Sequence, residues 1–172
     1  MTHPEPWTDL ATYPPAAHVG DRPDVSAWLR RHDAPAELDT LGGFAHYLAT
    51  GSRTGGRYGL YRWDMGPQPG GPAPHYHRTM TEAFFVLSGS VRLYDGDTWT
   101  DAAPRDFCHV PEGGVHAFRN ESGAAVSMLI LFVPGAPREA YFEGLVEMFT
   151  SGRDVSQEEY ADFCERHDNH FV

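Results

Sequence analysis

The chain has 172 residues and a formal net charge of −11, with 41% hydrophobic and 22% charged residues. This length and composition fit one globular domain with an apolar core. A strongly acidic surface repels nucleic acid phosphates and anionic lipids, so neither is expected as a partner.

Residues 1 to about 23 are rich in proline and polar residues, and we expect an arm with little regular structure there. Asp24 is placed to cap a short helix over Val25–Arg31. Trp28 and Leu29 would form the buried side of this helix.

From residue 44 to residue 133, short runs of aromatic and β-branched residues alternate with turn residues, among 18 glycines and 14 prolines in the whole chain. This texture is typical of an antiparallel sandwich or barrel. Asp95-Gly96 predicts a tight hairpin turn. The predicted strands are Phe44–Thr50, Arg57–Met65, His75–His77, Glu82–Leu87, Val91–Tyr94, Thr98–Asp101, Asp106–Val110, His116–Asn120 and Val126–Val133.

Beyond the strands the pattern becomes helical. Apolar residues at spacings of three and four predict one amphipathic helix, with Phe142, Leu145, Met148 and Phe149. A second helix is predicted from Ser156, which has capping-box spacing to Glu159. Its stripe consists of Tyr160, Phe163, Cys164 and His167. We expect both helices to pack on the barrel wall, so residues 1–43, 44–135 and 136–172 form the arm, the barrel and the helices of one domain.

Four side chains in successive predicted strands are the candidate metal ligands. His75 and His77 are two residues apart on a strand, so their imidazoles point to the same face. A turn between His77 and Glu82 would bring Glu82 to that face. His116 follows a Pro- and Gly-rich reversal that fixes where it enters the sheet.

Three imidazoles and one carboxylate suit one divalent transition metal, namely Fe, Mn, Ni, Cu, Co or Zn. A metal that prefers five or six ligands would keep positions free for water, dioxygen or substrate. A His-x-His pair alone is a weak signal, because two strand histidines can be ordinary surface residues. The addition of Glu82 and His116 makes the pattern specific.

These residues resemble the two motifs of the cupin family. The pattern His-x-His, four residues, Glu, six residues, Gly is matched by His75, His77, Glu82 and Gly89. The pattern Pro-x-Gly-x-x-His-x-x-x-Asn is matched by Pro111, Gly113, His116 and Asn120. Pro69 and Arg105 stand where the family has a glycine six residues before each motif. The resemblance covers roughly residues 44 to 133 and implies an all-β antiparallel jelly-roll barrel.

Within the cupins, the chain looks most like the single-domain quercetin dioxygenase-like group. That resemblance implies a non-haem dioxygenase acting on a small aromatic or polyketide-like enol or catechol, with Glu82 as both metal ligand and catalytic base. It also implies a homodimer. A metal-dependent isomerase, cyclase or decarboxylase, or a binding cupin without enzymatic activity, remains open.

Other residues are assigned ordinary roles. His109 and His46 are expected to be satisfied core or rim histidines, and Cys108 a small core residue. The remaining histidines, among them His3, His18, His32, His167 and His170, are expected at the surface or termini. Arg62 and Arg119 are expected on solvated faces. The side chains expected to line the barrel are Tyr58, Phe84, Val86, Phe118, Met128, Ile130 and Phe132.

The location of the protein is predicted from three absences in the sequence. The two cysteines, Cys108 and Cys164, form no paired framework and no CxxC motif, which favours reduced thiols in the cytoplasm. The N-terminus lacks a basic start followed by an apolar run, so no signal peptide is predicted. No run approaches about 20 apolar residues, so no transmembrane helix is predicted.

Overall fold

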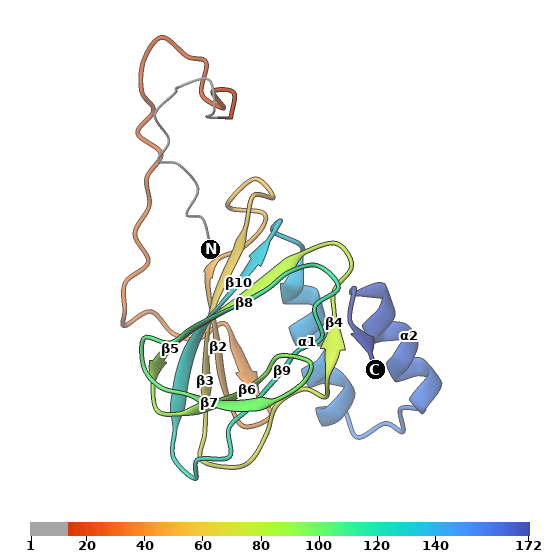
Figure 1. The fold of residues 1–172 in the computed structure, drawn as a ribbon. Coiled ribbons are helices and arrows are strands. Elements are labelled where there is room, and N and C mark those ends of the chain that lie inside the picture. Colours follow the sequence, from red (N-terminus) through yellow and green to blue (C-terminus); the bar gives the residue numbers. More distant parts are fainter. Residues whose placement is uncertain (1–13) are drawn as a thin grey trace. The chain divides into compact units, whose positions relative to one another are not determined.

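The structure is a computed structural model, and it describes residues 14–172. The chain separates into two compact units, Met1–Arg31 and His32–Val172. All helices and strands of the described residues lie in the second unit (Figure 1). The predicted arm lies partly outside the described residues, and residues 14–23 form neither helix nor strand.

The short helix predicted over Val25–Arg31 does not form, so this prediction was wrong. Trp28 is 44% exposed and Leu29 is 80% exposed, so neither forms a buried side. The physical reason is that a seven-residue helix provides too few hydrogen bonds to offset the cost of nucleation unless an apolar face is buried.

The second unit consists mainly of strands. They are β1 (Leu38–Thr40), β2 (Gly43–Ala49), β3 (Gly59–Met65), β4 (His75–Tyr76), β5 (Thr81–Ser88), β6 (Val91–Tyr94), β7 (Trp99–Ala102), β8 (Phe107–Val110), β9 (Ala117–Arg119), β10 (Val126–Val133) and β11 (His170–Phe171). The helices are α1 (Arg138–Thr150) and α2 (Gln157–Arg166).

The strands pair in antiparallel fashion into sheets with a common core. One sheet has the order β1-β2-β3-β10-β5-β8, a second has the order β7-β6-β9, and β11 pairs with β4. Side chains of β10 alternate between buried and half-buried, as a strand with one face on the core requires. Phe84 of β5 meets Phe118 of β9 across the interior, with ring centroids 5.6 Å apart. The all-β jelly-roll prediction is confirmed.

The predicted strands agree with the structure to within a few residues, with two additions and two corrections. β1 and β11 were not predicted, because each has only two or three residues and no alternating pattern. His116 lies just before β9, in an isolated bridge with His75. Tyr58 precedes β3 and is 40% exposed, so it does not line the barrel, whereas the other six predicted lining residues are buried.

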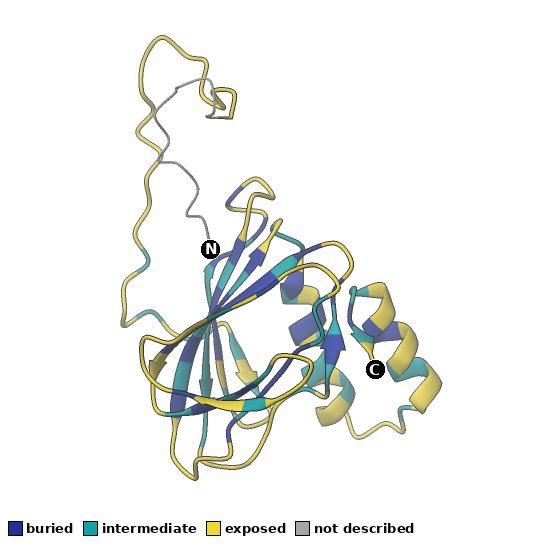
Figure 2. Cartoon of the chain, viewed as in Figure 1, coloured by how far each residue is buried: buried dark blue, intermediate teal, exposed yellow. Residues whose placement is uncertain are grey.

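Helix α1 packs on the barrel wall as predicted, whereas α2 packs on α1, with the Phe163 ring 5.8 Å from that of Tyr141. Phe142 of α1 is buried against Tyr61 and Trp63 of β3, at ring distances of 5.3 and 4.9 Å. The Ser156 hydroxyl accepts a hydrogen bond from the backbone N–H of Glu159 and caps α2. Figure 2 shows the buried face of α1 turned toward the barrel and exposed residues on α2 facing outward. Among residues 14–172, the structure contains no helix with the length and apolar character needed to span a bilayer.

Two turns next to the cupin-like motifs have left-handed backbone. Gly89 has φ +77, and a Cβ atom there would lie 2.5 Å from Val126 Cγ1, so only glycine fits this turn. Arg105 occupies the position where the motif has glycine and has φ +82. The turn therefore keeps the glycine conformation, and the arginine accepts the backbone strain.

Candidate metal centre

The four predicted metal ligands meet in the interior of the barrel. His75 begins β4, His77 follows it, Glu82 lies in β5, and His116 precedes β9. Each of the four side chains is at most 4% exposed. One nitrogen or oxygen atom from each lies within 4.8 Å of the others, so the cluster could hold a metal ion after small side-chain rotations.

Backbone hydrogen bonds bring the two motifs together. His75 and His116 exchange N–H to carbonyl bonds of 3.0 and 2.8 Å. The N–H of Gly113, a residue with φ +79, donates to the His77 carbonyl at 2.7 Å. The turn that contains Pro111 and Gly113 therefore places His116 directly opposite the segment of residues 75–77.

Each imidazole of the cluster is oriented by a hydrogen bond from Nδ1 to a backbone carbonyl. The acceptors are the carbonyls of Ala73 for His75, Asp168 for His77 and Gly114 for His116. A carbonyl can only accept, so Nδ1 carries the proton in each ring. The Nε2 lone pair of each neutral ring is then free to bind a metal, as is usual for metal-ligating histidines.

Two short contacts between imidazole nitrogens and the Glu82 carboxylate would be stabilised by a cation. His77 Nε2 lies 3.0 Å and His116 Nε2 lies 2.8 Å from Glu82 Oε2. If both rings are neutral and protonated on Nδ1, the lone pair of each Nε2 faces the Glu82 carboxylate, and these contacts are repulsive. A proton on Nε2 or a divalent ion between these groups would remove this repulsion, and nitrogen and oxygen donors of this kind suit transition metals. The residues present therefore fit the metal that the sequence predicts.

The electrostatics of the cluster are those of a buried site. Burial, followed by the nearby His116, lowers the pKa of His75 to about 4, so this ring is neutral at pH 7. Burial lowers the pKa of His116, but the neighbouring Glu82 carboxylate outweighs it and the pKa is raised, so in the absence of a metal Glu82 favours a proton at His116 Nε2. Burial also opposes ionisation of Glu82, but its close contacts with His116 and His77 hold its pKa well below the ordinary range.

The segment after α2 holds the loop between His77 and Glu82 in place. The Asp168 carboxylate accepts hydrogen bonds from the backbone N–H groups of Arg78 and Thr79, both at 2.9 Å, and from the Thr79 hydroxyl at 2.7 Å. The Asp168 carbonyl accepts from His77 Nδ1. A single residue thus fixes both a ligand and the turn that brings Glu82 to the same face.

A cavity of 380 Å³ borders the cluster. His75 and Glu82 contribute to its wall, and most other lining side chains are apolar. Of the predicted barrel-lining residues, Phe118, Ile130 and Phe132 face this cavity. Helix α1 supplies part of the opposite wall, so the helix does more than cover the barrel. A cavity of this size and character suits a small apolar molecule.

The other histidines of interest lie outside the cluster. His109 is exposed and is absent from the cavity wall. His46 is 8% exposed and contacts Asp64 and Arg62 on the outer face of the sheet. His167 and His170 are half-buried, which corrects their assignment to the surface. His170 lies in β11, because pairing with β4 orders the end of the chain.

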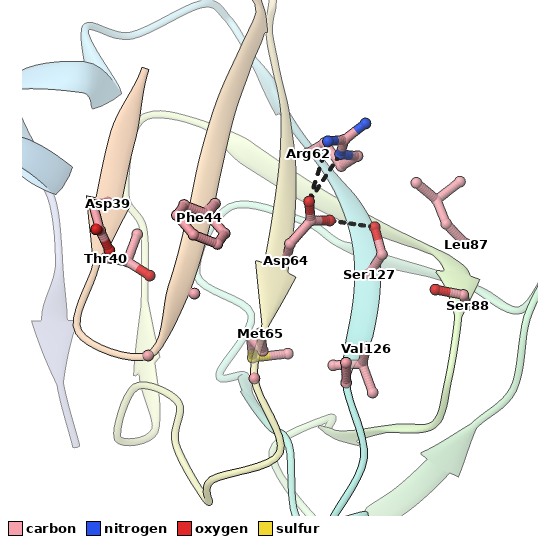
Figure 3. Close-up of a pocket in the computed structure, with 14 residues that line it drawn as sticks. Asp39, Thr40, Phe44, Arg62, Asp64, Met65, Leu87, Ser88, Val126 and Ser127 are labelled. Atoms are coloured by element: carbon pink, nitrogen blue, oxygen red, sulfur yellow. Dashed lines mark hydrogen bonds and ion pairs between the residues drawn. The ribbon is translucent and has the colours of Figure 1, made fainter. Parts of the chain in front are cut away.

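A shallow hollow of 720 Å³ lies on that outer face, around the ion pair between Arg62 and Asp64 (Figure 3). Ser127 donates to the Asp64 carboxylate at 2.6 Å. Side chains alternate along a strand, so these residues point away from Tyr61 and from the barrel interior. The hollow contains none of the four candidate ligands. The candidate metal centre therefore borders the inner cavity and not this hollow.

A jelly roll with three histidines and a glutamate that converge in its interior defines the class of metal-dependent cupins. The comparison with protein-family models agrees, because residues 61–132 match the model described as "Cupin domain". Residues 61–132 therefore form a cupin domain.

Similar proteins support the same assignment. A 70-residue region is 34% identical to quercetin 2,3-dioxygenase from Bacillus subtilis, covering 41% of this chain and 20% of the relative. The match therefore spans about one fifth of that protein. The structure of KdgF from a Halomonas species has a TM-score of 0.57 at 13% identity, covering 66% of this chain and 97% of that one. A predicted oxalate decarboxylase from Thermotoga maritima has a TM-score of 0.50 at 16% identity, covering 53% and 79%. These two likenesses show the fold alone.

Two residues near the centre were not found from the sequence. Arg138 lines the cavity, and its spacing to Phe142 and Leu145 places it on the apolar stripe of α1. A charge on a buried stripe is the signal that could have identified it. Asp168 carries no such signal, because its role depends on a long-range contact that the sequence does not indicate.

Proposed function

We propose that His75, His77, Glu82 and His116 bind one divalent metal ion, and that the protein is a dioxygenase for a small enol or catechol. The observation that carries this proposal is the buried cluster, whose ligand atoms lie within 4.8 Å of one another. The partial likeness to a quercetin 2,3-dioxygenase supports the choice of reaction.

The residues of the chain would bind the substrate, orient it and exclude water. A bound redox-active ion would supply Lewis acidity and the means for dioxygen to react with the substrate. Phe118, Ile130 and Phe132 provide an apolar wall for a ring or polyketide-like body. Glu82 lines the same cavity, and we assign its carboxylate the second role of accepting the substrate hydroxyl proton.

Oxygen consumption tests this proposal directly. The protein is loaded in turn with Fe, Mn, Co, Ni, Cu and Zn and mixed with flavonols, diketones and catechols in an oxygen electrode. We expect uptake with at least one redox-active ion and none with Zn. Glu82→Gln should abolish it, whereas Asp154→Asn, at an exposed site, should not. The absence of uptake across the whole panel would contradict the dioxygenase assignment. Turnover of a substrate without oxygen would instead indicate an isomerase, cyclase or decarboxylase.

We also propose that the chain forms a homodimer through the outer face of the six-stranded sheet. Phe85 and Phe107 are directly paired on neighbouring strands and are 36% and 64% exposed. Phe107 lies on the edge strand β8 and Phe85 on its neighbour β5, and an exposed apolar pair at a sheet edge favours contact with another sheet. Sedimentation of the wild-type protein should give a dimer, and Phe107→Asp should give a monomer. A wild-type monomer at all concentrations would disprove the proposal.

A further inference from the structure

Arg138 is a buried cation in the wall of the cavity beside the candidate metal centre. It is the first residue of α1 and is 3% exposed. Glu82 and Arg138 are the only charged side chains among the described residues that line this cavity. The cavity thus has a carboxylate within the metal cluster and a guanidinium in a wall that is otherwise mainly apolar.

The guanidinium is held in one orientation by neutral groups. Arg138 Nη1 donates to the His167 carbonyl at 2.7 Å, and Nη2 donates to Asn169 Oδ1 at 2.8 Å. Asn169 is itself fixed, because its amide donates to the Tyr141 hydroxyl at 2.9 Å. The Tyr141 ring lies 4.2 Å from the guanidinium carbon. This arrangement fixes the side chain before any ligand arrives.

Arg138 lacks an anionic partner within residues 14–172. None of the salt bridges of the described residues includes it, and Nε is buried without a hydrogen-bond partner. Two of the five guanidinium N–H donors are therefore used. A buried charge without a counter-ion is costly, so an anion bound at this point would be stabilised.

The charge of the cavity indicates what kind of anion would fit. A divalent ion with Glu82 leaves one positive charge, and Arg138 adds a second. An ionised hydroxyl at the metal and a carboxylate at Arg138 would balance both. The guanidinium fork matches a carboxylate in shape and charge. The 380 Å³ volume and the aromatic wall limit the body between these two groups to a small, largely apolar one.

We propose that Arg138 is a positioning residue that binds the carboxylate of the substrate, and that the substrate class is small enol or phenol acids. This inference rests on the proposed function, because it places the hydroxyl oxygen of the substrate at the metal and its carboxylate at Arg138. It narrows the substrate from enols and catechols in general to those that carry a carboxylate.

Calorimetric titration of the full chain loaded with Zn tests the inference without turnover. The probes are benzoate and its neutral counterpart benzamide, and the variants are Arg138→Met and Arg138→Lys. We expect the wild-type protein to bind benzoate at least about tenfold more tightly than benzamide. Arg138→Met should weaken the affinity for benzoate by about 10- to 100-fold and change the affinity for benzamide by less than about twofold. Arg138→Lys keeps the charge and should retain part of the preference.

Three outcomes would overturn the inference. The first is a wild-type protein that binds benzoate no more tightly than benzamide, the second is an Arg138→Met variant that still binds benzoate more tightly, and the third is an Arg138→Met variant that loses affinity for both probes equally. The second would place benzoate at the metal, and the third would indicate a structural role. If Arg138→Met does not fold, the wild-type preference and Arg138→Lys decide the question. The titration measures binding and not oxygen consumption. Its result can therefore be interpreted even if the dioxygenase proposal fails.

Discussion

Replacing Asp168 with alanine should loosen the metal centre without removing any of its ligands. The substitution deletes the acceptor for the N–H groups of Arg78 and Thr79 and for the Thr79 hydroxyl, at 2.7–2.9 Å. It leaves the Asp168 carbonyl that orients His77. The substitution also removes the contact between the Asp168 carboxylate and His170 Nε2 at 3.1 Å. Any effect on metal binding must therefore pass through the turn between His77 and Glu82 or through β11, which pairs with β4.

The size of the effect follows from the contacts. Three half-exposed hydrogen bonds to a carboxylate contribute about 2 kcal/mol together after discounting for solvent. Asp168 has φ +58, a conformation that alanine tolerates poorly, which adds about 1 kcal/mol. We therefore expect Asp168→Ala to lower the free energy of unfolding of the metal-free protein by about 3 kcal/mol. Loss of a residue that orients ligands typically lowers metal affinity by about 10- to 100-fold.

Urea denaturation measures the stability, and competition with a chelator for Zn measures the affinity. Asp168→Asn keeps an acceptor and tolerates the left-handed conformation, so it should lose less in both assays. Asp154→Ala removes the same charge from an exposed site and should behave like the wild-type protein. The reasoning is refuted if folded Asp168→Ala binds Zn as tightly as the wild-type protein.

Three further predictions concern backbone strain and pH. Arg105→Gly should raise the free energy of unfolding by about 1 kcal/mol, because φ is +82 at this position; an unchanged urea midpoint would show that the turn is unstrained. Gly89→Ala should lower the free energy of unfolding by more than about 2 kcal/mol, because its Cβ would clash with neighbouring atoms. Gly123→Ala, at φ +71 with open space around it, should lower it by only about 1 kcal/mol. Equal urea midpoints for the two variants would rule out the clash. The pKa of His75 falls from 6.5 unfolded to about 4 folded, so its stabilising contribution is complete above pH 6.5 and is lost as pH falls toward 4. The metal-free protein should lose about 3 kcal/mol over that window through this group, and a His75→Gln variant with the same pH dependence would contradict the assignment.

The parts of the fold that could be predicted from sequence are those set by local patterns. Alternating strands and turn glycines located the barrel, and the two motifs located the four candidate ligands. The helix over Val25–Arg31 failed because a cap and two apolar residues do not stabilise so short a segment without tertiary packing. β11 and Asp168 were missed because their roles depend on contacts with β4 and its loop, more than 80 residues earlier in the chain.

Arg138 illustrates a different limit. Its position on the apolar stripe of α1 was readable, but its role depends on the direction from which the helix approaches the barrel. Only the structure shows that the start of α1 borders the same cavity as His75 and Glu82. Sequence patterns therefore identified the candidate metal ligands, and the packing of α1 identified the second charged group of the cavity.

The metal content of the purified protein, measured by elemental analysis after reconstitution and desalting, tests the central claim most directly. We expect about one divalent ion per wild-type chain and almost none in a His75→Ala/His116→Ala variant that retains its strand signal by circular dichroism. Equal metal content in the two proteins, or no retained ion with Fe, Mn, Co, Ni, Cu or Zn, would contradict the account.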